Sequence, residues 1–267
     1  MNIKEVIENR RSVRTYSGTL TKEDKQKLSE YINSLTNPFG VKSEFRFLSS
    51  DEHDVSSPVI VGTDEFIAAK VQQAEQFELA YGYDFESVCL YAASIGIGTV
   101  MLAGTLSRRA FEKAMELNRG EVMPLASPIG YPAEKMSVRE KMMRGGVKAD
   151  ERLPFEKLFC KNDFTAPLQL DNAGKFGEAL QMVRLAPSAV NKQPWRAVVC
   201  GNSVHFFKKG NKGFTSDEFD LQMIDMGIAL AHFDLTLKEM GAQGKFVKKE
   251  LLFEIENGLQ YIISYEE

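Results

Sequence analysis

The sequence predicts an α+β fold built from two similar halves, each a mixed, mainly antiparallel sheet flanked by helices. Helical and strand-like patterns of apolar residues alternate along the 267 residues, which is typical of sheets with helices packed on them. The same order of elements recurs at a nearly constant spacing. Long helical patterns end at Gly96 and Gly241, and prolines follow an earlier helix at Pro38 and Pro187. These offsets of 145 and 149 residues indicate an internal duplication.

The repeat divides the chain into two predicted domains, residues 1–150 and residues 151–267. Each half opens with a short helical pattern, Ile3–Asn9 in the first and Pro154–Phe159 in the second. Residues 135–152 are charged and interrupted by glycines, so we expect them to form a connecting arm.

Composition narrows the class of protein. With 43% hydrophobic residues, 26% charged residues and a net charge of −4, the chain has no basic field that would attract nucleic acid or an anionic membrane. The three cysteines are far apart, which favours a reducing compartment. The three histidines show no ligand spacing, and no run of about 18 apolar residues is present. We therefore expect a cytoplasmic protein with no metal site and neither nucleic acid nor membrane as a partner.

In the first half, local signals predict helices and strands in alternation. Thr21 is a favourable N-cap with acidic residues in the following turn, so a helix is expected over Thr21–Leu35. Gly96 and Gly98 follow a helix, which indicates a helix C-cap and a tight turn, not a dinucleotide fingerprint. The other expected elements are strands at Glu44–Leu48, Pro58–Gly62, Val100–Leu102 and Ala126–Tyr131, and helices at Phe111–Leu117 and within Asp64–Ile95, with a break around Gly82.

In the second half, Leu221–Met240 is the longest uninterrupted helical pattern and has a broad apolar face. We expect it to pack against the helix that ends near Ile95. The other expected elements are a helix at Lys175–Leu185, a hairpin of strands Val198–Cys200 and Val204–Phe207, and a closing strand at Tyr261–Ser264.

Arginines cluster immediately after the first helix, at Arg10, Arg11 and Arg14. In an extended segment Arg10, Ser12 and Arg14 point to one side, because side chains alternate along a strand. Two guanidinium groups and a hydroxyl on one side can clamp a phosphate, since charge-assisted hydrogen bonds to an anion are strong. The alternative is a solvated basic patch.

A second unusual stretch is the loop LAPSAVNKQPWR over Leu185–Arg196. Its two prolines fix two φ angles and remove two N–H donors, so neither a helix nor a central strand can continue through it. The loop also carries the hydroxyl of Ser188 and the carboxamides of Asn191 and Gln193. Such groups can bind the edge of a flat heteroaromatic ligand. The alternative is a proline-rich turn before a strand.

The two halves differ in a complementary way. Residues 159–163, which correspond to the arginine segment by the repeat, contain one basic residue. Residues 38–45, which correspond to the proline loop, lack its Asn and Gln. One half therefore keeps the clamp and the other keeps the loop. Of the two equivalent sites that a pair of halves would share, one has both the clamp and the loop and is complete, and the other is degenerate.

These stretches resemble the flavin-dependent nitroreductase family. RRSVRTY after the first helix and APSAVNKQPW before a strand are similar to the two most recognisable segments of that family, and YGYDFESVCLYAASIGIGTVMLAGTL and IDMGIALAHFDLTLKEMGAQG resemble its long central helix with the strand after it. Typical members are homodimers with FMN at the subunit interface. This chain resembles the tandem-duplicated subgroup in which two such units share one polypeptide as a pseudo-dimer. The resemblance implies a monomer.

The resemblance also implies an FMN site between the halves. Arg10, Arg11 and Ser12 match residues that hold the phosphate and ribityl end. Arg14 matches a basic residue near the N1–C2=O edge of the isoalloxazine, and Arg152 resembles an arginine that returns to the phosphate. The remaining matches are backbone near the flavin N5 and a loop that a partner subunit donates in typical members. They are Ala103 and Gly104, and Pro187, Ser188, Ala189, Asn191 and Gln193.

The implied function is that of an FMN-dependent oxidoreductase that reduces nitroaromatic, quinone or similar small-molecule acceptors with NAD(P)H in a ping-pong cycle. Because the flavin carries the hydride chemistry, no catalytic side chain is expected. No segment can be assigned to a nicotinamide cofactor. The alternatives are an FMN or nucleotide-phosphate binding module without turnover, and a purely structural protein in which the arginines are bystanders.

Overall fold

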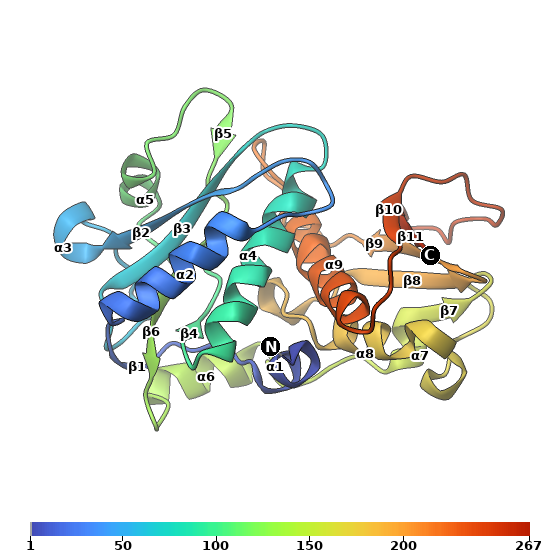
Figure 1. Cartoon of the computed structure of the whole chain (residues 1–267), viewed down its shortest axis with the longest axis horizontal. Coiled ribbons are helices and arrows are strands. Elements are labelled where there is room, and N and C mark those ends of the chain that lie inside the picture. The colour runs from blue at the N-terminus through green and yellow to red at the C-terminus, as the bar shows by residue number, and fades with distance from the viewer. Residues whose placement is uncertain (1) are drawn as a thin grey trace.

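Two sheets lie on opposite sides of a pair of long central helices (Figure 1). Residues 2–267 are described by a computed structural model. The central helices are α4 (Phe77–Ser94) and α9 (Leu221–Glu239). The α+β class is confirmed, and so is the expected packing of the two long helices against each other.

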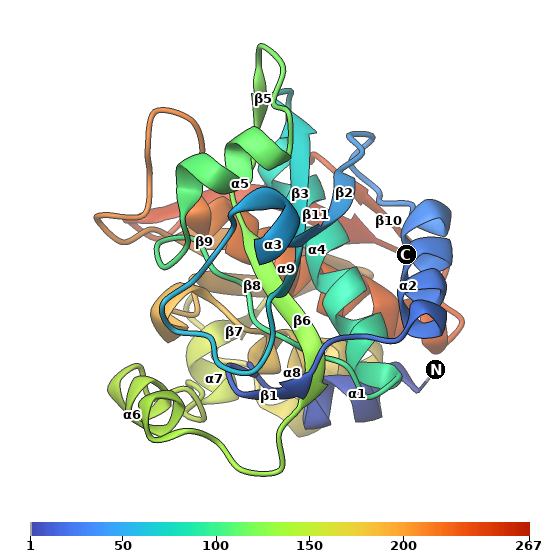
Figure 2. The same cartoon turned by 90° about the vertical axis from the view of Figure 1, so that its left-hand side faces the viewer.

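The first sheet is antiparallel and has the strand order β1-β6-β3-β2, with β4 added to β6 and β5 added to β3. Its central strand β3 is covered on both faces (Figure 2). Ile67 belongs to a buried cluster with helices α2 and α4, and Phe66 belongs to another with helix α5. The bounds are β1 Tyr16–Gly18, β2 Glu44–Ser49, β3 Glu65–Gln72, β4 Gly98–Thr99, β5 Glu121–Val122, β6 Ala126–Pro132, α2 Lys22–Ser34 and α5 Arg108–Ala114.

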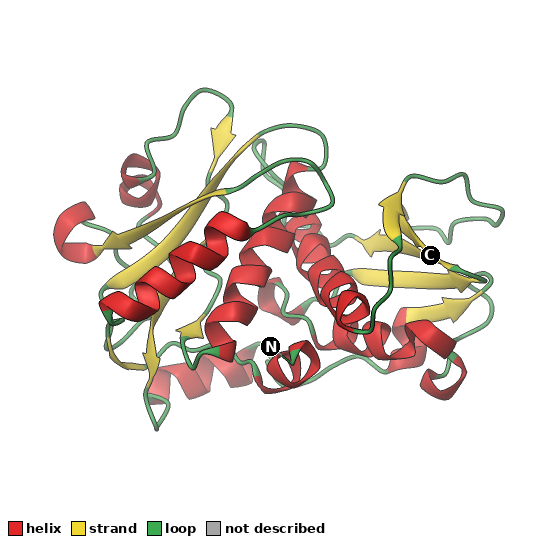
Figure 3. Ribbon diagram, in the orientation of Figure 1, coloured by secondary structure: helices red, strands yellow, loops and turns green. Residues whose placement is uncertain are grey.

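The second sheet has the order β10-β11-β9-β8-β7 and is antiparallel except for the β7–β8 pair (Figure 3). Helices α8 and α9 pack on it through apolar side chains. The bounds are β7 Phe159–Lys161, β8 Trp195–Cys200, β9 Ser203–Lys209, β10 Lys245–Val247, β11 Leu259–Glu266 and α8 Gly177–Leu185. The other helices are α1 Ile3–Asn9, α3 Ser50–His53, α6 Val138–Gly146 and α7 Phe155–Leu158, with 3₁₀ turns at Leu170–Asn172, Gly174–Phe176 and Ala189–Asn191.

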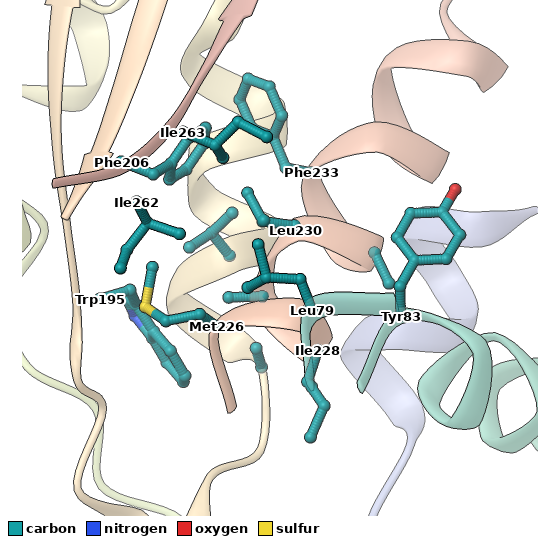
Figure 4. Packing of buried hydrophobic residues seen from close by; sticks show 14 of the residues in the cluster. Leu79, Tyr83, Trp195, Phe206, Met226, Ile228, Leu230, Phe233, Ile262 and Ile263 are labelled. Atoms are coloured by element: carbon teal, nitrogen blue, oxygen red, sulfur yellow. The ribbon is translucent and has the colours of Figure 1, made fainter. Parts of the chain in front are cut away.

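The backbones of helices α4 and α9 are in contact at two glycines, one on each helix. A Cβ atom at Gly82 of α4 would lie 2.1 Å from the carbonyl oxygen of Ile224, and one at Gly227 of α9 would lie 2.3 Å from that of Leu79. Apolar side chains surround this crossing and reach the second sheet (Figure 4). Both helices are apolar on nearly all sides because both are enclosed. None of the helices described is long and apolar enough to cross a membrane.

Several sequence expectations are wrong in instructive ways. Residues 65–72, expected within a helical region, form strand β3, which lacks polar alternation because both of its faces are buried. Helix α4 is not broken at Gly82, because the glycine accommodates the neighbouring helix. Pro58–Gly62 is a turn in which Val61 forms one isolated bridge with Thr15. The connecting arm contains a helix, α6, capped by Ser137.

We predict that Gly82→Ala destabilises the protein, because the added methyl group must push α9 away. Overpacking of this kind costs about 1–3 kcal/mol, more than alanine gains in helix propensity. The matched control is Gly145→Ala in α6, where a Cβ atom meets nothing within 4 Å. Urea unfolding should show a lower free energy of unfolding for the first variant and no loss for the second. Equal stability of the two variants would contradict the proposed close approach.

Candidate functional site

All but one of the residues proposed from the sequence line a single cavity of about 410 Å³. This volume lies in the range of small-molecule sites. The walls come from the segment 10–14, residues 99–105, the arm 143–152, the loop 187–191 and helix α9. The exception is Gln193, which lies in an adjoining hollow beside Asn191. The cavity therefore joins segments that are far apart in the sequence, from Arg10 to Ile228.

The arginine segment is extended, as its spacing predicts. Helix α1 ends at Arg10, whose φ and ψ are −63° and 133°. The N–H of Val13 then donates to the carbonyl of Thr99 at 2.9 Å, and the carbonyl of Arg14 accepts from Val61 at 3.0 Å. Val13 is buried in the interior, whereas Arg10 and Arg14 line the cavity. Arg11 lines it as well, so the clamp holds one more cation than strict alternation allows.

The guanidinium groups of this segment are largely unused by the protein. Within residues 2–267, the side chains of Arg10, Arg11 and Arg14 donate no hydrogen bond. The Nε atoms of Arg10 and Arg14 are buried without a partner. Burial lowers the pKa of Arg14, and the nearby Glu140 opposes that effect. Because buried donors without partners are costly, this wall is suited to an anionic ligand.

Arg152 connects the arm to the proline loop. Its guanidinium donates to the carbonyls of Ala149 and Glu151 at 2.8 and 2.9 Å, and to that of Leu185 at 3.2 Å. Burial and the charge of Arg10 lower its pKa. Its Nε atom is buried without a partner in the described chain. Arg152 is thus both a structural tie and a further cation in the cavity wall.

The proline loop has an unusual backbone. Val190, Asn191 and Gln193 all have positive φ angles, of 42°, 57° and 50°. Such angles are rare outside glycine, and a β-branched residue such as valine is strained there. The loop is held by the N–H of Gln193, which donates to the Ser188 hydroxyl at 2.9 Å. Val190 is 55% exposed and lines the cavity.

The two carboxamides of this loop have a different use from the expected one. Asn191 donates from Nδ2 to the carbonyls of Lys148 and Glu151 at 2.7 and 2.9 Å. Gln193 accepts from the N–H of Leu153 at 2.9 Å. Both amides thus fasten the loop to the arm, a role that the sequence interpretation did not include, and Asn191 also lines the cavity.

The segment after β4 also forms part of the cavity wall. Ala103 and Gly104 line the cavity with Met101 and Leu102. Arg108 fixes this turn, because its guanidinium donates to the carbonyls of Ala103 and Met123 at 2.8 and 2.7 Å. The sequence gives no sign of this supporting role, since Arg108 sits in a run of arginines that looks like a solvated helix start.

Two buried acids in the wall were missed by sequence reasoning. Glu86 of α4 and Asp225 of α9 both line the cavity and are almost fully enclosed. Asp225 accepts from the N–H of Ala189 with Oδ1 at 3.0 Å and Oδ2 at 3.2 Å, which ties α9 to the proline loop. The available signal was an acid among the apolar residues of each helix, a position that usually requires a partner.

Burial raises the pKa of the Asp225 carboxyl to about 8. This pKa is higher than the value of about 4 in the unfolded chain, so protonation of Asp225 stabilises the folded state. The contribution to the free energy of unfolding is complete below about pH 4 and is lost as the pH rises to about 8. We predict that Asp225→Asn, which can still accept from Ala189, removes this loss. Between about pH 5 and about pH 7, urea unfolding should show the wild type losing up to about 1.4 kcal/mol per pH unit relative to the variant. A pH-independent difference would contradict the assignment.

Comparisons with known proteins agree with this architecture. A family profile described as "Putative TM nitroreductase" matches residues 2–237. The crystal structure of a "putative nitroreductase" from Thermotoga maritima MSB8 is 21% identical and has a TM-score of 0.62, covering 99% of this chain and 92% of that one. No curated protein gives a significant match.

Other solved structures match about half of the chain. A "putative NADH dehydrogenase/NAD(P)H nitroreductase" from Parabacteroides distasonis is 20% identical, with a TM-score of 0.41, and covers 51% of this chain and 90% of that one. An "FMN-dependent nitroreductase" from Clostridium difficile R20291 is 14% identical, with a TM-score of 0.38, and covers 49% and 88%. The profile match extends over most of the sequence, and the chain therefore belongs to the TM nitroreductase family.

Proposed function

We propose that the protein is an FMN-dependent oxidoreductase that reduces nitroaromatic, quinone or similar acceptors with electrons from NAD(P)H. Membership of a nitroreductase family supports the reaction class. The cavity is the observation that supports the choice of cofactor. Arg10, Arg11 and Arg14 line this cavity together, and their side chains donate no hydrogen bond to the described protein.

The residues present fit FMN. The guanidinium groups of Arg10 and Arg14 donate no hydrogen bond to the described protein, and a phosphate or a flavin carbonyl supplies acceptors for them. Apolar side chains of the same cavity, among them Met101, Leu102 and Ile228, offer surface for a flat ring. We assign Arg10, Arg11, Ser12 and Arg152 to the phosphate and ribityl end. Arg14, the backbone of Ala103 and Gly104 and the loop 187–191 are assigned to the ring.

Bound FMN would accept and donate hydride, and the chain would supply position and charge. A cation at the electron-rich edge of a reduced ring stabilises it by about 1.5–3 kcal/mol for one charge-assisted hydrogen bond. In a two-electron couple, about 1.4 kcal/mol corresponds to about 30 mV. Arg14 is thus expected to raise the potential of a bound flavin by tens of millivolts.

We also propose that residues 1–150 and 151–267 are two related halves that pair as a pseudo-dimer in a monomeric protein. Gly82 and Gly227, which face the α4–α9 crossing, are 145 residues apart, the same offset as Gly96 and Gly241. This equal spacing supports a duplication. Sedimentation should give a single species with the mass of one chain; a stable dimer would contradict the proposal.

The flavin site is tested by titrating the protein with FMN and following quenching of flavin fluorescence. We predict that Arg10→Ala combined with Arg14→Ala weakens FMN binding at least about 10-fold, because two charge-assisted hydrogen bonds are lost. The control is Arg109→Ala, an exposed arginine outside the cavity. Unchanged affinity of the double variant would contradict the clamp.

Turnover separates an enzyme from a binding module. NAD(P)H oxidation in the presence of a quinone or a nitroaromatic compound should be continuous in the FMN-loaded protein. FMN binding without oxidation of either nicotinamide cofactor would favour the module.

A further inference from the structure

A buried acid–imidazole pair, Glu86 and His232, lies behind the arginine clamp. We propose that this pair positions Arg10: His232 fixes the Glu86 carboxylate, and Glu86 in turn orients the Arg10 guanidinium toward an anion in the cavity. The inference rests on the proposed function, because it states how the same site holds its phosphate.

The pair joins three helices. Glu86 comes from α4, His232 from α9 and Met182 from α8. His232 Nε2 lies 2.7 Å from Glu86 Oε1, and His232 Nδ1 lies 2.9 Å from the carbonyl oxygen of Met182. Since a carbonyl oxygen can only accept, Nδ1 must carry a hydrogen, which fixes the orientation of the ring. The contact between Nε2 and Glu86 Oε1 then requires a second proton, which the two side chains share. The side chains of Glu86 and His232 are both 0% exposed, so neither can turn to water.

Arg10 lies next to this pair but forms no hydrogen bond with it. Its Nε lies 3.6 Å from Glu86 Oε1, beyond hydrogen-bond distance, and its side chain is 8% exposed. Arg10 Nε and Glu86 Oε2 are both buried and have no hydrogen-bond partner in the described chain. Two orphaned atoms of opposite character therefore lie in neighbouring groups. A small movement of Arg10 that pairs them would relieve both, and would leave the Nη atoms for a ligand.

A purely structural role accounts poorly for this arrangement. A buried ion pair adds little stability over apolar residues of the same shape. Glu86 Oε2, the oxygen that His232 does not bind, also stays without a partner unless it acts on the geometry of the Arg10 guanidinium. Both Arg10 and Glu86 line the cavity, so Glu86 lies where the orientation of the Arg10 guanidinium affects ligand binding.

The test separates the phosphate from the rest of the ligand. FMN and riboflavin differ only in the phosphate, so the ratio of their affinities reports the clamp. We expect Glu86→Gln to lower this ratio about 10-fold, the value of one misplaced charge-assisted bond, and His232→Gln to lower it in the same direction. The control is Asp234→Asn, a buried acid of α9 that binds Tyr83 and Lys238 outside the cavity. Circular dichroism and unfolding curves establish that each variant is folded.

A double-mutant cycle tests whether Glu86 acts through Arg10. In the Arg10→Ala background, Glu86→Gln should leave the FMN-to-riboflavin ratio unchanged. An additive loss in the double variant, or an unchanged or increased ratio in Glu86→Gln alone, would overturn the proposal.

The two proposals can fail separately. If the wild type binds neither FMN nor riboflavin, the proposed function fails, and the same variants are then compared with inorganic pyrophosphate as the probe. Weaker pyrophosphate binding by Glu86→Gln than by Asp234→Asn would support the positioning role without a flavin. Equal binding would exclude it.

Discussion

The backbone contact between α4 and α9 is the constraint on which the rest of the molecule depends. Gly82 and Gly227 allow the two helices to approach until a methyl group would collide with a carbonyl oxygen. This approach places Glu86 within 2.7 Å of His232, and it brings Asp225 to the loop that closes the cavity. Each sheet then packs on its own side of the helix pair (Figure 1). The site is therefore a product of the helix crossing as much as of the loops.

The cavity combines excess positive charge with few internal partners. Arg152 donates mainly to backbone carbonyls. The side chains of Arg10, Arg11 and Arg14 donate no hydrogen bond to the described residues. A stable protein rarely retains buried donors in this state. The cavity also contains the carboxyl of Asp225, which hydrogen bonds only to the Ala189 N–H among the described residues. The electrostatics of the site thus favour an anionic ligand.

Much of the fold and the site could be predicted from local pattern. The capped helix after Thr21, the hairpin around Gly201 and the extended arginine segment follow from short-range signals, and they occur as expected. Strand β3 and the unbroken α4 could not be predicted, because the first depends on burial of both faces and the second on the approach of Ile224 from another helix. The same limit explains Glu86 and Asp225: a helical pattern shows an acid among apolar residues, but not the partner from another helix. The use of Asn191 and Gln193 depends on where the arm returns, which no local signal specifies.

Both Arg10, near the N-terminus, and the Pro187–Asn191 loop, in the second half of the sequence, line the cavity and belong to one polypeptide. A nascent chain therefore cannot assemble the cavity until most of its length has left the ribosome, and a prematurely terminated product would carry the arginines without the wall that faces them. Dilution has no effect on a site made in this way. Two walls on separate subunits would come apart at low concentration, whereas here covalent continuity keeps them at a fixed ratio of one to one.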